Sequence, residues 1–225
     1  MKNVLNITNG KHFNDYISKH LNGVFYPFNE AFIEGKLTYP LFDEVFINKR
    51  VENHYKLVDE YNVKEYSLLM DLFIDKEDYI HSFECIKLWF GDDTFCLINL
   101  LGLLTYLEQI NYRGEVLLNV INEEIYSLDQ NWLTINLGTF SESYKAMFVN
   151  KKVVYTNNLL IDKGIDMFNY LNQKDNIFHI YIKENIEILD RNLLLINLLK
   201  MSKEYGLSDI YLTKMIDEHI NKTLK

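Results

Sequence analysis

The chain has 225 residues, which suits one hydrophobic core with a small helical unit attached. Its residues are 48% hydrophobic, with only 2 prolines and 9 glycines, a composition that excludes disordered and turn-repeat proteins. The 23 basic residues against 32 acidic ones give a net charge of −9, the wrong sign for holding a phosphate backbone by bulk electrostatics. We therefore expect no nucleic-acid partner.

Cysteine content and hydropathy indicate a cytoplasmic protein. Cys85 and Cys96 are the only cysteines, too few for the disulfide framework of a secreted domain. The first residues contain no apolar run of signal-peptide length. The longest apolar stretch, residues 96–107, is shorter than the roughly 20 residues that a membrane span requires. We expect a reducing compartment and no membrane association.

The N-terminal residues predict a strand, a helix and a second strand. Residues 4–7 have the apolar character of a short buried strand, and residues 12–21 place apolar side chains on one helical face. Residues 24–26 then resume as a strand. Pro27 is expected to end that strand, because proline cannot donate a ladder hydrogen bond.

A charged helical insertion is predicted at residues 41–75. Two helices are expected in it, meeting near Tyr61 and Asn62. We expect this insertion to cover an edge of the sheet.

The clearest pattern follows the insertion. Residues 85–90 predict a strand, residues 94–109 a helix that is apolar on most sides, and residues 115–121 another strand. Strands that alternate with helices in this way form parallel sheets with right-handed crossovers. We therefore predict an α/β fold over residues 1–125, a doubly wound, mainly parallel sheet of about four strands.

The C-terminal part, residues 126–225, is predicted to be mainly helical and packed on the sheet. Thr139 and Glu142 have the spacing of a capping box, and Thr156 and Ser208 are candidate N-caps for later helices. The helices expected in this part cover residues 140–148, 157–171, 183–203 and 209–220.

Several short motifs carry a resemblance to a known family. They are Asn-Ile-Thr-Asn-Gly at 6–10, Phe-Asn-Glu at 28–30 with Arg50 downstream, and Leu-Trp-Phe-Gly-Asp-Asp at 88–93 before a leucine-rich helix. In these motifs the chain resembles bacterial proteins grouped as domain of unknown function 1835. The resemblance extends into residues 137–141 and 205–208. It implies the same order of elements and assigns no activity.

The chain departs from that family at two places. Lys11 stands where members usually carry an acidic residue after the first-strand glycine. The glutamine often found in the helix after the third strand is absent.

Polar residues follow three of the predicted strands. In an open parallel sheet, ligands bind beyond the carboxyl ends of the strands, where the strand order reverses. Helix N-termini there attract anions, and carboxylates accept hydrogen bonds from sugar hydroxyls or bind divalent ions. The candidate residues in these turns are Asn9 and Gly10, Glu30, and Asp92 and Asp93.

Each candidate also has a purely structural interpretation. Gly10 is favoured as a tight turn over a phosphate cradle, because the second and third glycines of a dinucleotide fingerprint are missing. Asp92 or Asp93 is favoured as the cap of its helix over a ligand or catalytic role, and only one of them can occupy the N-cap. Lys11 and His12 are favoured as solvated residues.

Arg50 and Trp89 are the remaining candidates. Arginine is rare in this chain, and its planar fork suits bidentate contact with a carboxylate or phosphate. Two roles are about equally favoured for Arg50. It could hold an anionic ligand, or it could form a structural pair with Glu30 or Asp93. Core packing is favoured for Trp89 over stacking on a base.

The leading hypothesis is a protein that binds a small anionic or nucleotide-like ligand at the carboxyl ends of the strands. One alternative is a non-catalytic regulatory or interaction protein, with a protein partner or as a homodimer. The second is a hydrolase or transferase in which Asp92 or Asp93 acts as general base or metal ligand. Cysteine catalysis is rejected, no zinc-ligand spacing occurs, and the sequence leaves the cofactor unknown.

Overall fold

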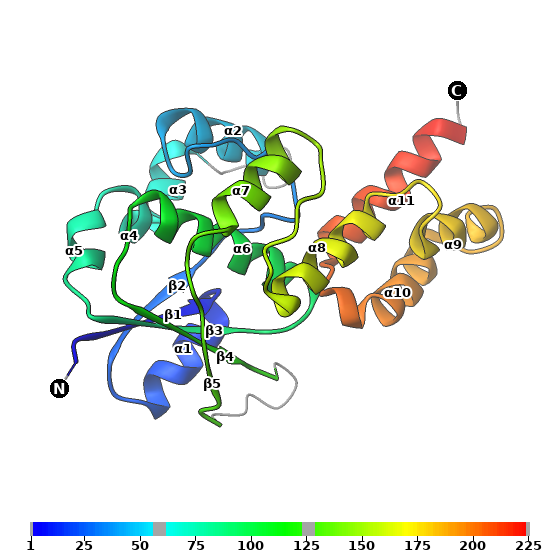
Figure 1. The fold of residues 1–225 in the computed structure, drawn as a ribbon. Helices are drawn as coiled ribbons and strands as arrows, with labels where there is room; N and C mark the ends of the chain where they lie inside the picture. The colour runs from blue at the N-terminus through cyan, green and yellow to red at the C-terminus, as the bar shows by residue number, and fades with distance from the viewer. Residues whose placement is uncertain (1, 56–61, 123–128, 224–225) are drawn as a thin grey trace.

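The computed structural model describes residues 2–55, 62–122 and 129–223. Its centre is a five-stranded sheet with the order β2-β1-β3-β4-β5 (Figure 1). The first four strands are parallel, and β5 pairs with β4 in the antiparallel direction. The strands are β1 (Val4–Asn9), β2 (Val24–Phe28), β3 (Cys85–Phe90), β4 (Glu115–Val120) and β5 (Trp132–Thr134). The predicted doubly wound, mainly parallel α/β fold is confirmed.

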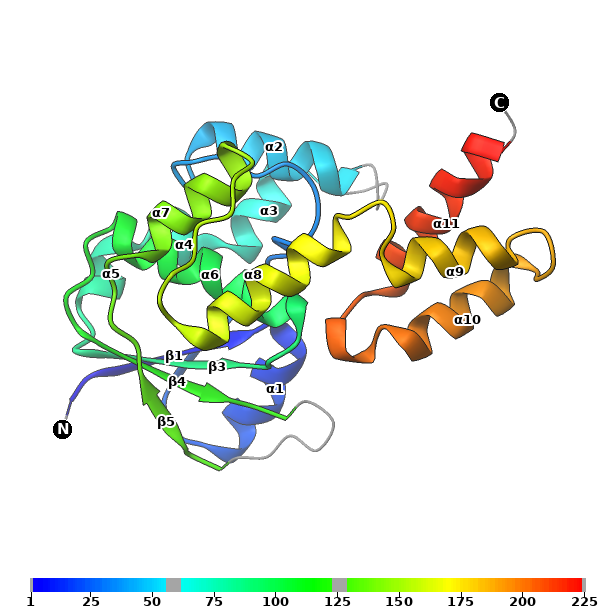
Figure 2. The ribbon, with the colours of Figure 1, turned by 45° about the vertical axis from the view of Figure 1, so that its right-hand side comes forward.

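The strand order reverses at β1. The chain passes from β1 through α1 (Lys11–His20) to β2 on one side, and then reaches β3 on the other side of β1. The crevice position of this fold therefore lies between the carboxyl ends of β1 and β3. Helix α1 covers one face of the sheet, and the other helices of the α/β part lie on the opposite face (Figure 2).

The core is built around α6 (Thr94–Gln109), which packs between the sheet and two later helices, α7 (Phe140–Tyr144) and α8 (Leu159–Leu171). Nearly all of its side chains are buried, as expected for a helix that is apolar on most sides. The bounds predicted for this helix and for β3 are confirmed.

The predicted end of the second strand is wrong. Strand β2 continues through Pro27, which lies opposite Thr8 in the parallel register, and ends at Phe28. Because β2 is an edge strand, only one of its sides must be hydrogen bonded, and a proline is tolerated there.

The insertion consists of short helices on the α6 face of the sheet. Asn62 begins α3 with a capping box that it shares with Glu65, whereas Tyr61 lies outside the described residues. Aromatic side chains pack the insertion onto the edge strand, with Phe73 5.1 Å from Phe28 between ring centroids. The helices are α2 (Glu44–Tyr55), α3 (Val63–Leu69), α4 (Asp71–Ile74) and α5 (Glu77–His81).

Helix α7 does not use the predicted capping box. The Thr139 side chain makes no cap hydrogen bond, and its hydroxyl donates instead to the Thr156 carbonyl oxygen at 2.7 Å. The Glu108 carboxylate, at the end of α6, accepts hydrogen bonds from the amides of Gly138, Phe140 and Ser141 at 2.5, 3.0 and 2.7 Å. The helix then continues as a π-helical turn, η1 (Lys145–Val149).

Two further helix predictions in the C-terminal part are wrong. Asn158, not Thr156, caps α8 by accepting from the Leu160 and Ile161 amides. The helix predicted over residues 183–203 is split into α9 (Ile177–Asn185) and α10 (Arg191–Met201), because Asp190 starts a new helix.

The predicted cap of the last helix is confirmed. The Ser208 hydroxyl accepts from the Tyr211 amide at 3.0 Å, at the start of α11 (Asp209–Thr223). A short 3₁₀ helix, η2 (Lys203–Tyr205), precedes it.

Buried hydrophobic residues form a main core, a small cluster between α1 and the sheet, and a separate helical cluster. The main core extends past the boundary predicted at residue 125. It includes side chains of α7 and α8, which come after that boundary in the chain. The helical cluster joins α9, α10 and α11, and it also includes Ile33 from the loop after β2 and Leu171 at the end of α8. These three helices lie beyond the end of the sheet toward which β3 and β4 point (Figure 2). Within the described ranges, no helix has the length and hydropathy of a membrane span.

Candidate functional site

Three of the predicted turns lie along one rim of the sheet. Gly10, Glu30 and Asp93 follow β1, β2 and β3, which are neighbours in the order β2-β1-β3. Parallel strands bring their carboxyl ends to the same edge. The polar side chains of these turns are therefore close enough to interact through residues of α6.

The turn after β1 faces α6. Gly10 has a positive φ of 85°, and its amide donates to the Phe28 carbonyl oxygen at 3.0 Å, which favours the tight-turn interpretation. The Asn9 side-chain amide donates to the Cys96 Sγ at 2.9 Å, and its oxygen accepts from Asn99 at 3.0 Å. Both ends of the Asn9 side chain are thus bonded within the protein.

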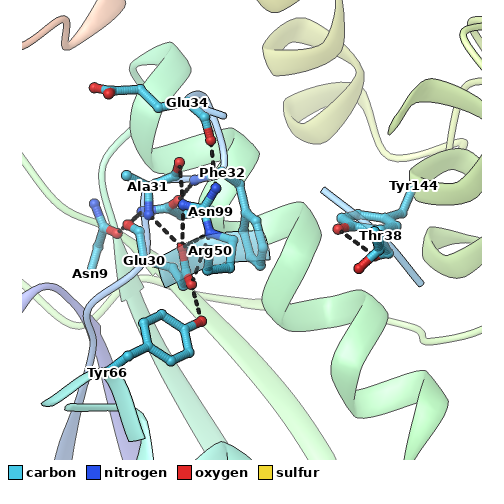
Figure 3. Close-up of polar contacts among 10 residues, drawn as sticks. All are labelled: Asn9, Glu30, Ala31, Phe32, Glu34, Thr38, Arg50, Tyr66, Asn99 and Tyr144. Carbon is cyan, nitrogen blue, oxygen red and sulfur yellow. Dashed lines mark hydrogen bonds and ion pairs between the residues drawn. The ribbon is translucent and has the colours of Figure 1, made fainter. Parts of the chain in front are cut away.

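Asn99 joins the turns after β1 and β2. Its Nδ2 also donates to the Glu30 carbonyl oxygen at 2.5 Å, and its Oδ1 accepts from the Phe32 amide at 2.9 Å (Figure 3). This buried amide was not among the predicted site residues. The only signal for it was a polar residue in an otherwise apolar helix.

Glu30 and Arg50 form a buried ion pair. The Arg50 Nη2 lies 2.7 Å from Glu30 Oε2, and Nε lies 3.0 Å from the same oxygen (Figure 3). The Tyr66 hydroxyl and the Ala31 amide also donate to the Glu30 carboxylate. Burial raises the pKa of Glu30, but the positive charge and hydrogen bonds of Arg50 outweigh it and hold that pKa below its ordinary value.

Arg50 has no side-chain nitrogen left without a partner. Its Nη1 donates to the Glu34 carbonyl oxygen at 2.6 Å, and Nη2 also donates to the Ala31 carbonyl oxygen at 3.0 Å. The side chain is only 1% exposed. Of the two interpretations of Arg50, these contacts favour the pairing with Glu30, which fixes the loop after β2.

Asp93 is the N-cap of α6. Its Oδ1 accepts from the Cys96 amide at 2.8 Å, and its Oδ2 accepts from the Cys96 thiol at 3.2 Å. Gly206, at a positive φ of 63°, lies so close that a Cβ there would be 2.4 Å from Asp93 Oδ1. Burial, with a smaller contribution from the charge of Asp92, raises the pKa of Asp93.

Asp92 does not cap α6 and pairs with a lysine of α8 instead. Its carboxylate lies 3.0 Å from Lys163 Nζ, which also donates to the Asp92 carbonyl oxygen at 3.1 Å. The two side chains are 62% and 48% exposed. Of the two adjacent carboxylates, Asp93 therefore caps the helix and Asp92 forms a solvent-exposed ion pair.

Trp89 and Lys11 make structural contacts. Trp89 is buried between the sheet and α1, where its indole nitrogen donates to Asn6 Oδ1 at 3.0 Å. Its ring packs edge-on against Trp132 at 4.8 Å. Lys11 is exposed and pairs with Asp15 at 2.9 Å. The favoured interpretations of Trp89 as a core residue and Lys11 as a solvated one agree with these contacts.

A cleft of about 620 Å³ opens at the carboxyl ends of β3 and β4. Helix α8 contributes Lys163, and η2 contributes Lys203 and Glu204. Asp92 and Asp93 are also in its wall, so the cleft adjoins the crevice position of the fold. Lys163 and Lys203 were not among the predicted site residues, because both come from the part of the chain for which only helix packing was predicted.

No three-residue group that could hold a metal ion occurs among the His, Cys, Asp and Glu side chains of the described residues. No family model, no curated protein and no solved structure matches this chain. The resemblance to domain of unknown function 1835 stays a prediction. The fold and the site define a doubly wound α/β protein with an internally bonded polar rim and an adjoining charged cleft.

Proposed function

We propose that the protein binds a small anionic ligand with hydroxyl groups, of the nucleotide or sugar-phosphate kind, in the cleft at the ends of β3 and β4. The observation that carries the proposal is that two lysines, Lys163 and Lys203, line this cleft together with three carboxylates, those of Asp92, Asp93 and Glu204. Ammonium groups attract a phosphate, and carboxylate oxygens accept hydrogen bonds from sugar hydroxyls. The cleft adjoins the strand reversal, which is where proteins of this fold class usually bind their ligands.

The cleft is favoured over the turns after β1 and β2 because one of its ion pairs, Asp92 with Lys163, can exchange partners. Asn9, Glu30 and Arg50 are engaged with buried or backbone groups, so a ligand would have to break those bonds. The Asp92–Lys163 pair is exposed. Exposed ion pairs contribute about 1 kcal/mol or less, so a ligand can replace this one at little cost.

Thermal unfolding in the presence of candidate ligands tests the proposal. AMP and ribose 5-phosphate are expected to raise the Tm, by about 5–10 °C when present at 100 times their Kd, whereas adenosine, which lacks the phosphate, raises it less. The double variant Lys163→Gln/Lys203→Gln is expected to lose most of the shift. Lys183→Gln/Lys200→Gln, at exposed lysines elsewhere, is the matched control. No shift with either phosphate, or an equal shift in both double variants, contradicts the proposal.

The same contacts favour binding over turnover. The hydrolase or transferase alternative needs Asp92 or Asp93 as a base and Arg50 as the anion holder. Asp93 accepts two hydrogen bonds as a cap, and Arg50 is bonded to Glu30 and to backbone oxygens. Cys85 and Cys96 are buried and form no disulfide, which supports the additional proposal of a reducing, cytoplasmic location.

A second candidate function, a protein-interaction role, is favoured by one feature of α10. This helix buries Leu194 and Leu198 on one side, yet Leu193, Ile196 and Leu199 are 37–48% exposed on the other. A helix that is apolar on two sides usually has a partner on each. If the partner is a second copy, sedimentation velocity is expected to show a dimer that Ile196→Lys dissociates. A monomer at high concentration contradicts the homodimer.

A further inference from the structure

A second cavity, of about 490 Å³, lies between the α/β core and the C-terminal helices. Its wall is formed by the loop after β2, the end of the π-helical turn η1, and parts of α8, α9 and α11. It shares no lining residue with the cleft at the ends of β3 and β4. The proposed function therefore leaves this cavity without a role.

The charged groups of this cavity favour an anion. Lys151, Lys152 and Lys214 line it, against Glu34 and Glu218. The chain as a whole has the opposite excess, with a net charge of −9. A concave surface with low-dielectric walls concentrates the potential of the charges that line it. An excess of one lysine over the glutamates suits one small anionic group better than a polyphosphate.

Part of the remaining wall is apolar, beside the polar side chains of Asn169, Asn172 and Tyr211. Phe148 and Phe168 meet edge to face, with 5.4 Å between their ring centroids, and both line the cavity. Leu37 and Met215 add aliphatic surface. Such a wall suits the apolar body of an organic ligand, because pockets for small molecules combine apolar surface with a few polar groups.

The backbone at Lys151 is a second, independent observation. Lys151 has a φ of 56°, the left-handed conformation that helix ends usually give to glycine or asparagine. It follows the π-helical turn, and the Lys152 amide donates back to the Ala146 carbonyl oxygen at 2.9 Å. Strained residues and π-helical turns are frequent at functional sites. This turn sets two consecutive lysines at the cavity.

We propose that this cavity is a second ligand site, which binds an organic anion with one carboxylate or phosphate-ester group and an apolar body. Lys151, Lys152 and Lys214 hold the anionic group, and the phenylalanine wall holds the body. This site is distinct from the cleft of the proposed function.

Ligand-observed saturation-transfer NMR with three fragments tests the second site. Benzoate and phenyl phosphate carry a ring and an anionic group, and benzyl alcohol carries the ring alone. We expect the two anions to bind and the alcohol to bind at least about tenfold more weakly, a difference of 1.4 kcal/mol or more. The ratio of the two anion Kd values identifies which headgroup is preferred. Equal binding of the alcohol, or no binding of either anion, overturns the proposal.

Variants separate the two sites. Lys152→Gln/Lys214→Gln is expected to raise the Kd of the anions about tenfold or more, because it removes two charged donors. Both lysines are exposed, so the fold is expected to tolerate their replacement. Lys163→Gln/Lys203→Gln, in the other cleft, is expected to leave this Kd unchanged. An unchanged Kd in the first variant, or an equal loss in the second, overturns the second site and leaves the AMP test of the other cleft unaffected.

Discussion

At the scale of single residues, the Glu30–Arg50 pair holds the polar rim together. Arg50 bonds to the Glu30 carboxylate and to the carbonyl oxygens of Ala31 and Glu34, so one side chain fixes the first part of the loop after β2. A buried ion pair adds little stability relative to a well-packed apolar pair. Removing one partner is costly, however, because it leaves the other charge buried without compensation.

We expect Arg50→Met to lower the free energy of unfolding by about 3–5 kcal/mol, measured by urea denaturation. The cause is the unpaired Glu30 carboxylate, together with the two carbonyl oxygens that lose their donor. Lys49→Met, at an exposed neighbour on the same helix, is the control and should change stability by about 0.5 kcal/mol or less. A loss below about 1 kcal/mol in Arg50→Met contradicts the role given to the pair.

The pH dependence of stability provides a separate check. The folded-state pKa of Glu30 lies below its ordinary value of 4.5, so the unfolded chain binds this proton more readily. Its stabilising contribution is therefore complete above the ordinary value and is lost as the pH falls through the folded-state pKa. The stability gap between the wild type and Glu30→Gln should shrink on acidification. Glu142→Gln, at an exposed carboxylate, is the control. A constant gap contradicts a depressed pKa.

How far these residues could be predicted depends on the range of the contacts involved. Glu30 with Arg50 was one of two open interpretations, because both residues stood out locally as an acidic turn residue and a rare arginine. Lys163 and Lys203 gave no such local signal, and Asn99 stood out only as a polar residue in an apolar helix. Their roles depend on which distant segment of the chain each one contacts. The periodicity of apolar residues predicts helices and strands but not those contacts.

At the scale of helices and strands, α7 is capped by a distant residue, Glu108, and not by the residues next to it in the sequence. Three backbone amides at the start of α7 donate to its carboxylate, although the chain offers a capping-box pair nearby. The carboxylate also carries the negative charge that a helix N-terminus favours. A contact with the distant residue Glu108 therefore replaces the capping box that the local sequence predicts.

We expect Glu108→Ala to lower the free energy of unfolding by about 2 kcal/mol, because three amides lose their acceptor. Glu108→Gln keeps one acceptor oxygen and should lose less. The comparison is Glu142→Ala, which removes the capping-box partner and should cost about 0.5 kcal/mol or less. A larger loss in Glu142→Ala than in Glu108→Ala would falsify the assignment of the cap.

Element boundaries were predicted well where an apolar run ended in a turn signal. Strand β3 and helix α6 are such cases, separated by Gly91 and the two aspartates. The break between α9 and α10 was missed, because Ile186 and Leu189 continue the apolar spacing through it. The end of β2 was missed because the tolerance of Pro27 depends on an edge position that only the sheet reveals.

At the scale of the whole molecule, the C-terminal helices shape both cavities. Gly206 rests on the Asp93 carboxylate, and η2 brings Lys203 and Glu204 to the cleft at the ends of β3 and β4. Helices α9 and α11 close the other cavity. The α/β fold was predictable from the alternation of strands and helices. The placement of the C-terminal helices over the rim was not, because it depends on contacts between distant segments.

We expect Gly206→Ala to destabilise the protein by about 1–2 kcal/mol or more, measured by thermal and urea unfolding. A Cβ at this position would overlap the Asp93 carboxylate, and the positive φ adds strain. Shortening the neighbour in Asp93→Ser/Gly206→Ala should recover part of the loss, whereas full additivity of the two single changes contradicts a direct contact.

The binding site itself can be mapped by ¹H–¹⁵N correlation spectra during titration with ribose 5-phosphate. We expect the backbone amides of Gly91, Asp92 and Lys203 to shift in a saturable manner, while those near Lys151 change little. Saturable shifts elsewhere with none at the ends of β3 and β4, or no shifts at all, would contradict ligand binding in the cleft.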